Sequence, residues 1–270
     1  MYLPKHFLAE EGPTRALLER MGAADLVTVT ESGPLATFLP LLYDPAPVEA
    51  GAAAPAPTPA GAPAPVSAPV PAGAPTPAGA LSPAGSTAPG GAPTPGGAPA
   101  AAPASVAEPA PIQGSLVGHV ARANPQWSTP AIGEAMVIVH GPDAYVSPSW
   151  YPSKAEHGRV VPTWNYTTIH VYGRLVVHDD PTWVEALVRR LTARHEASRP
   201  RPWSVDDAPE PYVAGQVRAI VGVEVVITRV EAKAKWSQNR PAADIAGVEQ
   251  GLVDAGRLDA LDALRVARAP

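Results

Sequence analysis

Alternation of apolar and polar positions is the clearest pattern along this chain. The longest stretch covers residues 167–178, and its apolar side is formed by Ile169, Val171, Leu175 and Val177. A period of two residues predicts a half-buried antiparallel strand. The same pattern, with turn residues between the stretches, predicts further strands at residues 25–31, 35–43, 115–122, 136–140, 145–147 and 221–227.

Apolar residues at helical spacing predict fewer elements. The expected helices cover residues 13–21, 181–197, 210–220 and a stretch that begins after Pro241. Asp179 or Asp180 is suited to cap the second of them. Strands do not alternate regularly with helices, so a doubly wound parallel sheet is not expected. The fold class predicted is mainly β, a closed barrel with peripheral helices.

One long segment interrupts this pattern. Residues 45–111 comprise 67 positions, of which 52 are Pro, Ala or Gly, and they contain no aromatic residue, Lys or Arg. A segment with so little apolar surface to bury does not offset the entropy lost on ordering, so a disordered insert is predicted. The barrel is therefore expected in two parts, residues 1–44 and 112–250, followed by a tail, residues 251–270, whose order the sequence does not decide.

Composition excludes several function classes. The formal net charge is −5 and no dense run of Lys and Arg occurs, so DNA binding is possible but is not supported by charge. The chain has no cysteine, which excludes disulfides, thiolate zinc sites and thiol catalysis. No apolar stretch is long enough to predict a membrane span, and a cytoplasmic protein is expected.

Known catalytic and metal-binding motifs do not indicate a function for this sequence. The sequence contains no HExxH, GxSxG, GxGxxG or P-loop motif, and no metal site is predicted. His140, His170 and His178 are expected to be structural groups on strands. Three serines of residues 147–153 lie near His157, but nearness in sequence does not make a catalytic triad.

Four segments combine aromatic, polar and basic residues. They are GHVARANPQW (118–127), SPSWYPSK (147–154), VPTWNY (161–166) and KWSQNRP (235–241). A flat heteroaromatic ligand with a phosphate group needs this mixture of aromatic walls, amide groups and cations. The same aromatic residues would equally suit a dimer interface, and both interpretations can hold together.

These segments, together with the first residues MYLPKHF, resemble the PaiB-type FMN-binding negative transcriptional regulators. The resemblance implies an FMN-binding split β-barrel, akin to pyridoxamine-phosphate-oxidase-like flavoproteins, that forms a homodimer with FMN in the groove between two barrels. It covers the chain apart from the insert and about the last twenty residues. Relatives have a short hairpin connection where this chain has its insert.

The resemblance also implies a set of cofactor-binding residues. Arg122 is the first choice for the phosphate, and Lys154, Lys235 and Arg240 are alternative or additional cations. Trp150, Tyr151, Trp164 and Asn165 are expected to line the flavin ring or to face the second subunit. The remaining candidates come from the same motifs and are His119, Asn124 and Gln238.

Three functions follow as hypotheses. The chain is expected to be an FMN-binding homodimer that acts as a transcriptional or redox regulator. An FMN-dependent oxidoreductase without a regulatory role is one alternative, and a dimeric interaction protein without a cofactor is another. No residue stands out as a general acid or base, so any chemistry would belong to the flavin.

Overall fold

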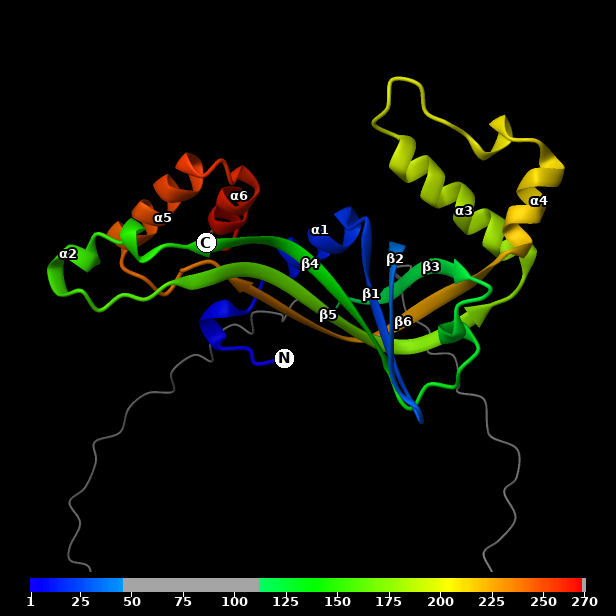
Figure 1. Cartoon of the computed structure of the whole chain (residues 1–270), viewed down its shortest axis with the longest axis horizontal. Helices are drawn as coiled ribbons and strands as arrows, with labels where there is room; N and C mark the ends of the chain where they lie inside the picture. The colour runs from blue at the N-terminus through cyan, green and yellow to red at the C-terminus, as the bar shows by residue number, and fades with distance from the viewer. Residues whose placement is uncertain (46–111, 269–270) are drawn as a thin grey trace, which may run out of the picture. The chain divides into compact units, whose positions relative to one another are not determined.

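Six antiparallel strands close into a barrel in the computed structural model, which describes residues 1–45 and 112–268. Neighbouring strands follow the order β1-β2-β3-β6-β5-β4, and β1 closes the barrel by pairing with β4 (Figure 1). The strands are β1 (Ala23–Thr30), β2 (Gly33–Pro45), β3 (Gly114–Ala121), β4 (Ala135–Val146), β5 (Thr163–His178) and β6 (Ile220–Lys235). The predicted class, a mainly β barrel with peripheral helices, is confirmed.

Six α-helices in the described residues pack at the periphery of the barrel. The α-helices are α1 (Glu11–Arg20), α2 (Ser153–His157), α3 (Pro181–Glu196), α4 (Glu210–Arg218), α5 (Ala242–Asp254) and α6 (Leu258–Val266). Four 3-10 turns join the elements: η1 (Lys5–Phe7), η2 (Pro125–Trp127), η3 (Pro148–Trp150) and η4 (Val205–Asp207). Asp180 caps α3 by accepting a 3.0 Å hydrogen bond from the backbone N–H of Thr182, so Asp180 rather than Asp179 is the cap.

The prediction of two separate strands at residues 136–140 and 145–147 is wrong, because both belong to β4. The structure has one strand with a bulge between His140 and Asp143, where Gly141 and Pro142 interrupt the regular pairing with β5. A bulge of this kind adds residues on one side of a pair without ending the strand, which breaks the period of two that the sequence analysis followed. The pairing of β5 with β6 also shifts register, between Tyr172 and Gly173. β6 continues past this bulge to Lys235, well beyond the predicted end at residue 227.

The barrel interior is apolar. Every second side chain of β3 enters it, and Leu116 and Val120 are buried there beside residues of the other strands. Val117, between them, points outward and packs against Leu187 and Leu191 of α3. The alternation that predicted the strands therefore sorts their side chains between the barrel core and a helix-covered outer surface.

The C-terminal region forms a second apolar cluster. The sequence leaves the order of residues 251–270 undecided; in the structure, residues 258–266 form α6, in which Ala260 and Leu264 are fully buried. This helix packs with α5 around Trp236, the large aromatic side chain that follows β6. Apolar positions three and four residues apart on α6 supply the packing face.

The predicted insert, residues 45–111, lies outside the described residues except for Pro45, which ends β2. On the other side of it, Gly114 begins β3, and the antiparallel register places Gly114 directly opposite Pro45. Among the described residues, no helix is both long and apolar enough to cross a membrane.

Candidate functional site

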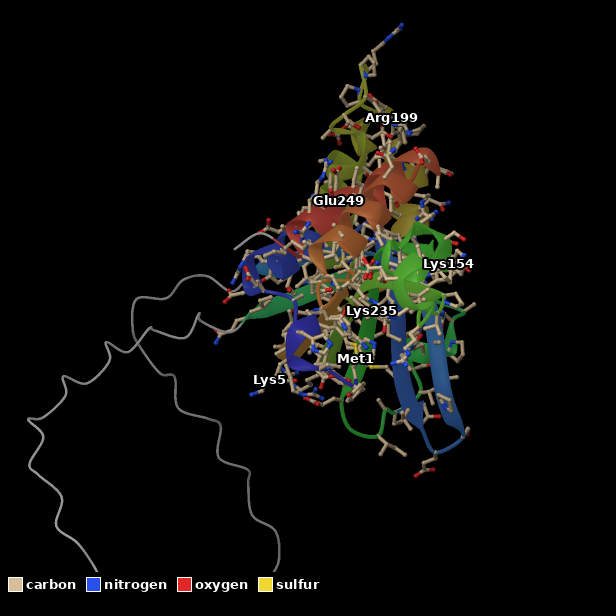
Figure 2. All side chains as sticks on the ribbon, turned by 90° about the vertical axis from the view of Figure 1, so that its left-hand side faces the viewer. Met1, Lys5, Lys154, Arg199, Lys235 and Glu249 are labelled. Carbon is tan, nitrogen blue, oxygen red and sulfur yellow. The ribbon has the colours of Figure 1, made fainter. Side chains whose placement is uncertain are left out.

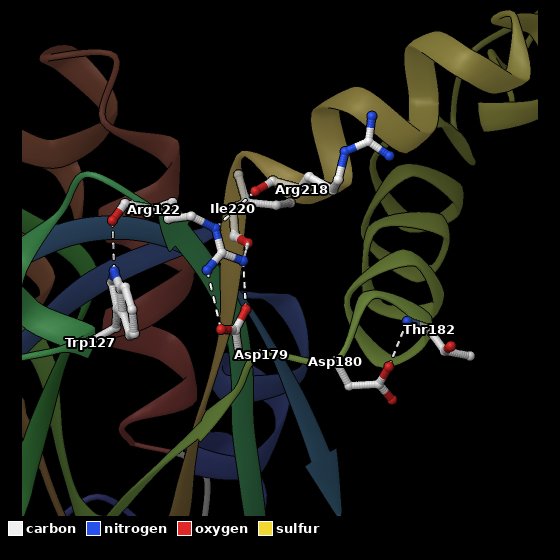
Figure 3. A network of polar contacts seen from close by, with 7 residues as sticks. All are labelled: Arg122, Trp127, Asp179, Asp180, Thr182, Arg218 and Ile220. Carbon is white, nitrogen blue, oxygen red and sulfur yellow. Dashed lines mark hydrogen bonds and ion pairs between the residues drawn. The ribbon is translucent and has the colours of Figure 1, made fainter.

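Arg122 follows β3 directly and is held by a network of polar contacts (Figure 3). Its Nη2 lies 2.5 Å from Oδ1 of Asp179, and its Nη1 lies 3.2 Å from Oδ2 of the same carboxylate. The guanidinium also donates to the carbonyl oxygens of Arg218 and Ile220, at 2.8 and 3.2 Å. The first-choice cation for the phosphate therefore already has an acidic partner and uses most of its N–H groups inside the protomer.

Asp179 is the residue that the sequence analysis missed here. It reaches Arg122 because β3 and β5 both pair with β6, so that Ala121 lies opposite Ile220 and His178 lies opposite Gly222. The two partners are 57 positions apart in the chain. Such a contact follows from strand order, for which the local sequence carries no signal.

The rest of the GHVARANPQW segment closes this end of the barrel. Asn124 caps η2 and donates a 3.0 Å hydrogen bond to Oγ1 of Thr37. Gln126 is buried and donates to the carbonyl oxygen of Leu26 at 3.0 Å, while Nε1 of Trp127 donates to the carbonyl oxygen of Arg122 at 2.8 Å. These contacts tie the segment to β1 and β2 and give its polar residues structural partners.

His119 lies on β3, within the same segment. Burial lowers the pKa of its imidazole, which favours the neutral form. Its Nδ1 atom is buried without a hydrogen-bond partner among the described residues. The ring therefore retains unused hydrogen-bonding capacity.

The other three aromatic and basic segments come together at the opposite end of the long strands. Residues 147–154 form η3 and the start of α2, residues 161–166 begin β5, and residues 235–241 join β6 to α5. Figure 2 views this end and labels Lys154 and Lys235. We call the cations Lys154, Lys235 and Arg240 the basic end.

Lys235 is the most enclosed cation of the basic end. Its Nζ donates to Oγ1 of Thr163 at 2.5 Å and to the carbonyl oxygen of Trp164 at 2.8 Å. Burial lowers the pKa of Lys235, Tyr166 opposes this effect, and the charge of Lys233 adds to it. An anion beside Nζ would offset both the burial and the repulsion.

The two remaining cations of the basic end also lack acidic partners. Nζ of Lys154 lies 3.4 Å from Oγ of Ser149, and the guanidinium of Arg240 lies over the ring of Tyr151, 4.8 Å from its centroid. Within the ranges 1–45 and 112–268, none of the three basic-end cations forms an ion pair, in contrast to Arg122.

Aromatic and amide groups at this end divide into exposed and buried sets. Trp164 is 51% exposed, and its ring lies 6.3 Å from that of Tyr145. Asn165 is fully buried, and its Nδ2 donates to Oγ of Ser237 at 3.0 Å. Tyr151 is 2% exposed, and its hydroxyl has no partner among the described residues. Trp164 can therefore contact a ligand directly, whereas Asn165 supports the fold of the site.

The turn after β6 is fixed by Ser237. This residue has a φ of 61°, a left-handed backbone conformation that is unusual for residues other than glycine. Gln238 beside it accepts from the backbone N–H of Trp236 and donates to the carbonyl oxygen of Ala234, both at 2.6 Å. Gln238 thus holds the turn that carries Arg240 toward Tyr151.

Trp150 occupies a groove made by two glycines of α5. A Cβ atom at Gly251 would lie 2.2 Å from the Trp150 ring, and one at Gly247 would lie 1.9 Å from its carbonyl oxygen. In addition, Asp244 accepts hydrogen bonds from the backbone N–H and the Oγ of Ser153, at 3.1 and 2.8 Å. These contacts attach η3 and α2 to α5 and position Lys154.

One protomer thus separates the predicted site residues into two groups. The pairs Ala121–Ile220 and Tyr166–Lys235 lie at opposite ends of β6, which at about 3.3 Å per residue are about 50 Å apart along the strand. Lys154, Trp164, Asn165, Lys235, Gln238 and Arg240 fall in one group with Trp150 and Tyr151, and His119, Arg122 and Asn124 fall in the other.

The basic end fits an aromatic ligand that carries a phosphate group. In the part of the chain that the structure describes, this end has three cations that form no ion pair and an exposed indole at Trp164, and the buried hydroxyl of Tyr151 has no hydrogen-bond partner. The Arg122 group fits such a ligand less well because Asp179 would repel an anion there. If FMN binds, Lys154, Lys235 and Arg240 are the residues best placed to hold its phosphate.

Comparisons with known proteins agree on one family. A family model described as "Putative FMN-binding domain" matches residues 93–229, half of the chain. An uncharacterized protein of Aspergillus fumigatus is 34% identical over 176 residues, covering 53% of this chain and 67% of its own length. Protease synthase and sporulation protein PAI 2 of Bacillus subtilis is 33% identical over 138 residues, covering 51% of this chain and 64% of its own length.

Among solved structures, the flavocytochrome Anf3 from Azotobacter vinelandii aligns with a TM-score of 0.43 and 10% identity, over 84% of this chain and 67% of that one. An FAD and heme binding protein from Mycobacterium smegmatis aligns with the same TM-score and 13% identity, over 88% and 77%. Likeness at this level says nothing about a ligand, whereas the sequence matches do identify relatives. This chain belongs to the FMN-binding domain family that includes the PaiB-type proteins.

Proposed function

We propose that this chain binds FMN as a homodimer and that the basic end holds the phosphate group of the cofactor. The observation that carries the proposal is that Lys154, Lys235 and Arg240 form no ion pair within the described residues, at the same end of the long strands at which Trp164 is exposed. Family membership supplies the identity of the cofactor. A phosphate group with a charge near −2 is stabilised by such cations through charge-assisted hydrogen bonds.

Lys235, Arg240 and Trp164 have distinct tasks in this proposal. Among the described residues, Nζ of Lys235 donates only to the neutral oxygens of Thr163 and Trp164, so a phosphate oxygen can accept its remaining N–H. Arg240 presents a planar guanidinium fixed over Tyr151, suited to two parallel hydrogen bonds to phosphate. Trp164 offers a flat wall for the isoalloxazine ring. The bound flavin would supply electron transfer, and the protein would orient it and exclude water.

A second copy of the chain is expected on the outer face of β4, β5 and β6. In Figure 1 the helices lie on one side of these long strands, and the N-terminal segment runs along the other. That outer face carries the ring of Tyr172, 3.6 Å from the guanidinium of Arg229, and His170, whose buried Nδ1 has no partner among the described residues. Aromatic and arginine side chains of this kind are enriched at protein interfaces.

A regulatory role is proposed ahead of enzymatic turnover. The name of the Bacillus subtilis relative, protease synthase and sporulation protein PAI 2, refers to sporulation, which suits a regulator. A flavin oxidoreductase is the alternative, and the rate of FMN reduction by NADH or NADPH distinguishes the two. Rapid steady-state turnover with an added electron acceptor would favour the enzyme.

The test compares FMN with riboflavin, which lacks the phosphate. The parent protein should bind FMN more tightly, and Lys235→Gln and Arg240→Gln should each weaken FMN by about 10- to 100-fold while leaving riboflavin unchanged. This range corresponds to the loss of one charge-assisted hydrogen bond, about 1.5–3 kcal/mol. Arg201→Gln is the matched control, since Arg201 is exposed and lies outside the candidate site.

A further variant separates the two groups of cations. Asp179→Asn removes the acidic partner of Arg122, so it should tighten FMN binding only if Arg122 holds the phosphate. Equal affinity of the parent for FMN and riboflavin would refute a phosphate site altogether. The mass of the same sample by light scattering tests the dimer, and a monomer that binds FMN fully would refute the shared groove.

A further inference from the structure

A cavity of about 580 Å³ lies apart from the basic end. It is lined by residues of α1, β5, β6 and α6 and is partly open to solvent. Its volume falls within the range typical of sites for small organic molecules. Gln238, which holds the turn after β6, also lines this cavity, whereas Lys154, Lys235, Arg240 and Trp164 do not.

The cavity and Lys235 are on opposite sides of β6. Ala234 lines the cavity, and the next residue, Lys235, carries the cation of the basic end. Successive side chains of a strand point to opposite faces of the sheet. A molecule in the cavity would therefore be separated from a phosphate bound at Lys235 by the strand itself.

The walls of the cavity are mostly apolar. Leu17 of α1, Ile169 of β5 and Ala263 of α6 contribute to them. At its edges, Leu8 is 52% exposed and Val266 is 51% exposed. A ligand that covers such half-exposed apolar side chains is stabilised by the burial of their apolar surface.

The rim of the cavity is acidic. Three carboxylates line it, those of Glu10, Asp259 and Asp262. The basic residues among its lining residues are Arg20, which is permanently charged, and His6. Asp259 is bonded to Arg257, which does not line the cavity. Within the described ranges, the side chains of Glu10 and Asp262 have no hydrogen-bond or ion-pair partner.

Helix α6 adds to this negative character. Its C-terminal residues Ala263, Val266 and Ala267 line the cavity, and the last turn of a helix presents carbonyl groups with partial negative charge. An anion such as a phosphate would be repelled from the rim, whereas a cation would be attracted. The interior, in turn, accepts an apolar group.

From this combination we infer that the cavity is a second ligand site, which takes a small apolar molecule carrying a single protonated amine. The apolar part fills the space between Leu17, Ile169 and Ala263. The ammonium group lies at the rim, within reach of Glu10 and Asp262. The inference does not rest on flavin binding, because neither the basic-end cations nor Trp164 line the cavity.

Three probes of the same shape test the site by calorimetry on the full chain: 3-phenylpropylamine, 3-phenylpropan-1-ol and 3-phenylpropanoate. The amine should bind about fivefold more tightly than the alcohol, because a partly exposed ion pair raises the affinity by up to about fivefold. The carboxylate should bind most weakly. Glu10→Gln combined with Asp262→Asn should reduce the amine to the affinity of the alcohol.

A matched control separates a local site from general attraction. Glu19→Gln combined with Glu210→Gln removes the same net charge at exposed positions outside the cavity and should leave the preference for the amine intact. Ala263→Phe should block all three probes, and Ala16→Phe on the opposite wall gives the same test if the first variant unfolds.

Several outcomes would overturn the inference. They are equal binding of the amine and the carboxylate, loss of the amine preference in the Glu19→Gln/Glu210→Gln control, unchanged binding in both blocked variants, and no binding of the amine at about 10 mM. Each is measurable with or without FMN, so a failure of the flavin proposal would not be mistaken for a failure of this one.

Discussion

Replacement of Gly251 by alanine is expected to destabilise the protein through one clash. Gly251 lies in α5, where glycine is an unfavourable helix residue, and it leaves room for the indole of Trp150. A Cβ atom at this position would lie 2.2 Å from Cδ2 and 2.6 Å from Cγ of that ring. Ordinary contact begins near 3.4 Å, so the ring has to move by about 1 Å.

The size of the effect follows from two opposing terms. Alanine gains about 1 kcal/mol over glycine in a helix interior, and overpacking costs about 1–3 kcal/mol. Gly215→Ala in α4 is the matched control, because its Cβ would meet nothing within 4 Å and only the helix term applies. The free energy of unfolding of the two variants should therefore differ by about 1–3 kcal/mol, with Gly251→Ala less stable.

Thermal unfolding followed by circular dichroism measures this difference. For a folded region of about 200 residues, each kcal/mol shifts the melting temperature by about 2–4 °C, so a difference of about 2–12 °C is expected. If Gly251→Ala unfolds at the same temperature as Gly215→Ala, Trp150 does not occupy this groove. FMN binding should also weaken in Gly251→Ala, because η3 and α2, which carry Lys154, depend on the same contact.

The remaining predictions concern the insert and His119. Replacement of residues 46–111 by about five residues should stabilise the protein by about 2 kcal/mol through loop-closure entropy, because Pro45 and Gly114 are already paired. A lower melting temperature together with loss of FMN would contradict this. Burial lowers the pKa of His119 below 6.5, so the unfolded chain binds more protons and stability falls as the pH drops through about 6.5. His119→Gln should flatten that decrease in denaturant unfolding between about pH 7.5 and 5.5, and an equally steep decrease in the variant would refute the assignment.

Local patterns were sufficient to predict most strands and helices. The apolar alternation that predicted β3 and β5 corresponds to side chains that enter the barrel, such as Leu116 and Ile169. The pattern failed where its period changed, at the bulge of β4, and it left the order of the chain end undecided, where α6 forms. In both places the tertiary packing, and not the local propensity, decides the structure.

The candidate site was less predictable because it depends on which strands are neighbours. Three of the four aromatic and basic segments meet because β5 begins where β6 ends, with Tyr166 opposite Lys235. Arg122, in contrast, is adjacent to Asp179 for the same topological reason. A cation's charge can be read from the sequence, but whether that charge is already neutralised cannot.

The separation of the two cation groups bears on the geometry of the proposed dimer. Arg122 and the basic end lie near opposite ends of β6 in one protomer, so no single FMN contacts both there. A two-fold axis near the middle of the outer face of β5 and β6 would reverse the strand direction in the second copy. The Arg122 group of each subunit would then approach the basic end of the other, as an isologous interface requires. In that arrangement Asp179→Asn would change FMN affinity only in the dimer, whereas Lys235→Gln would change it in any state that binds flavin.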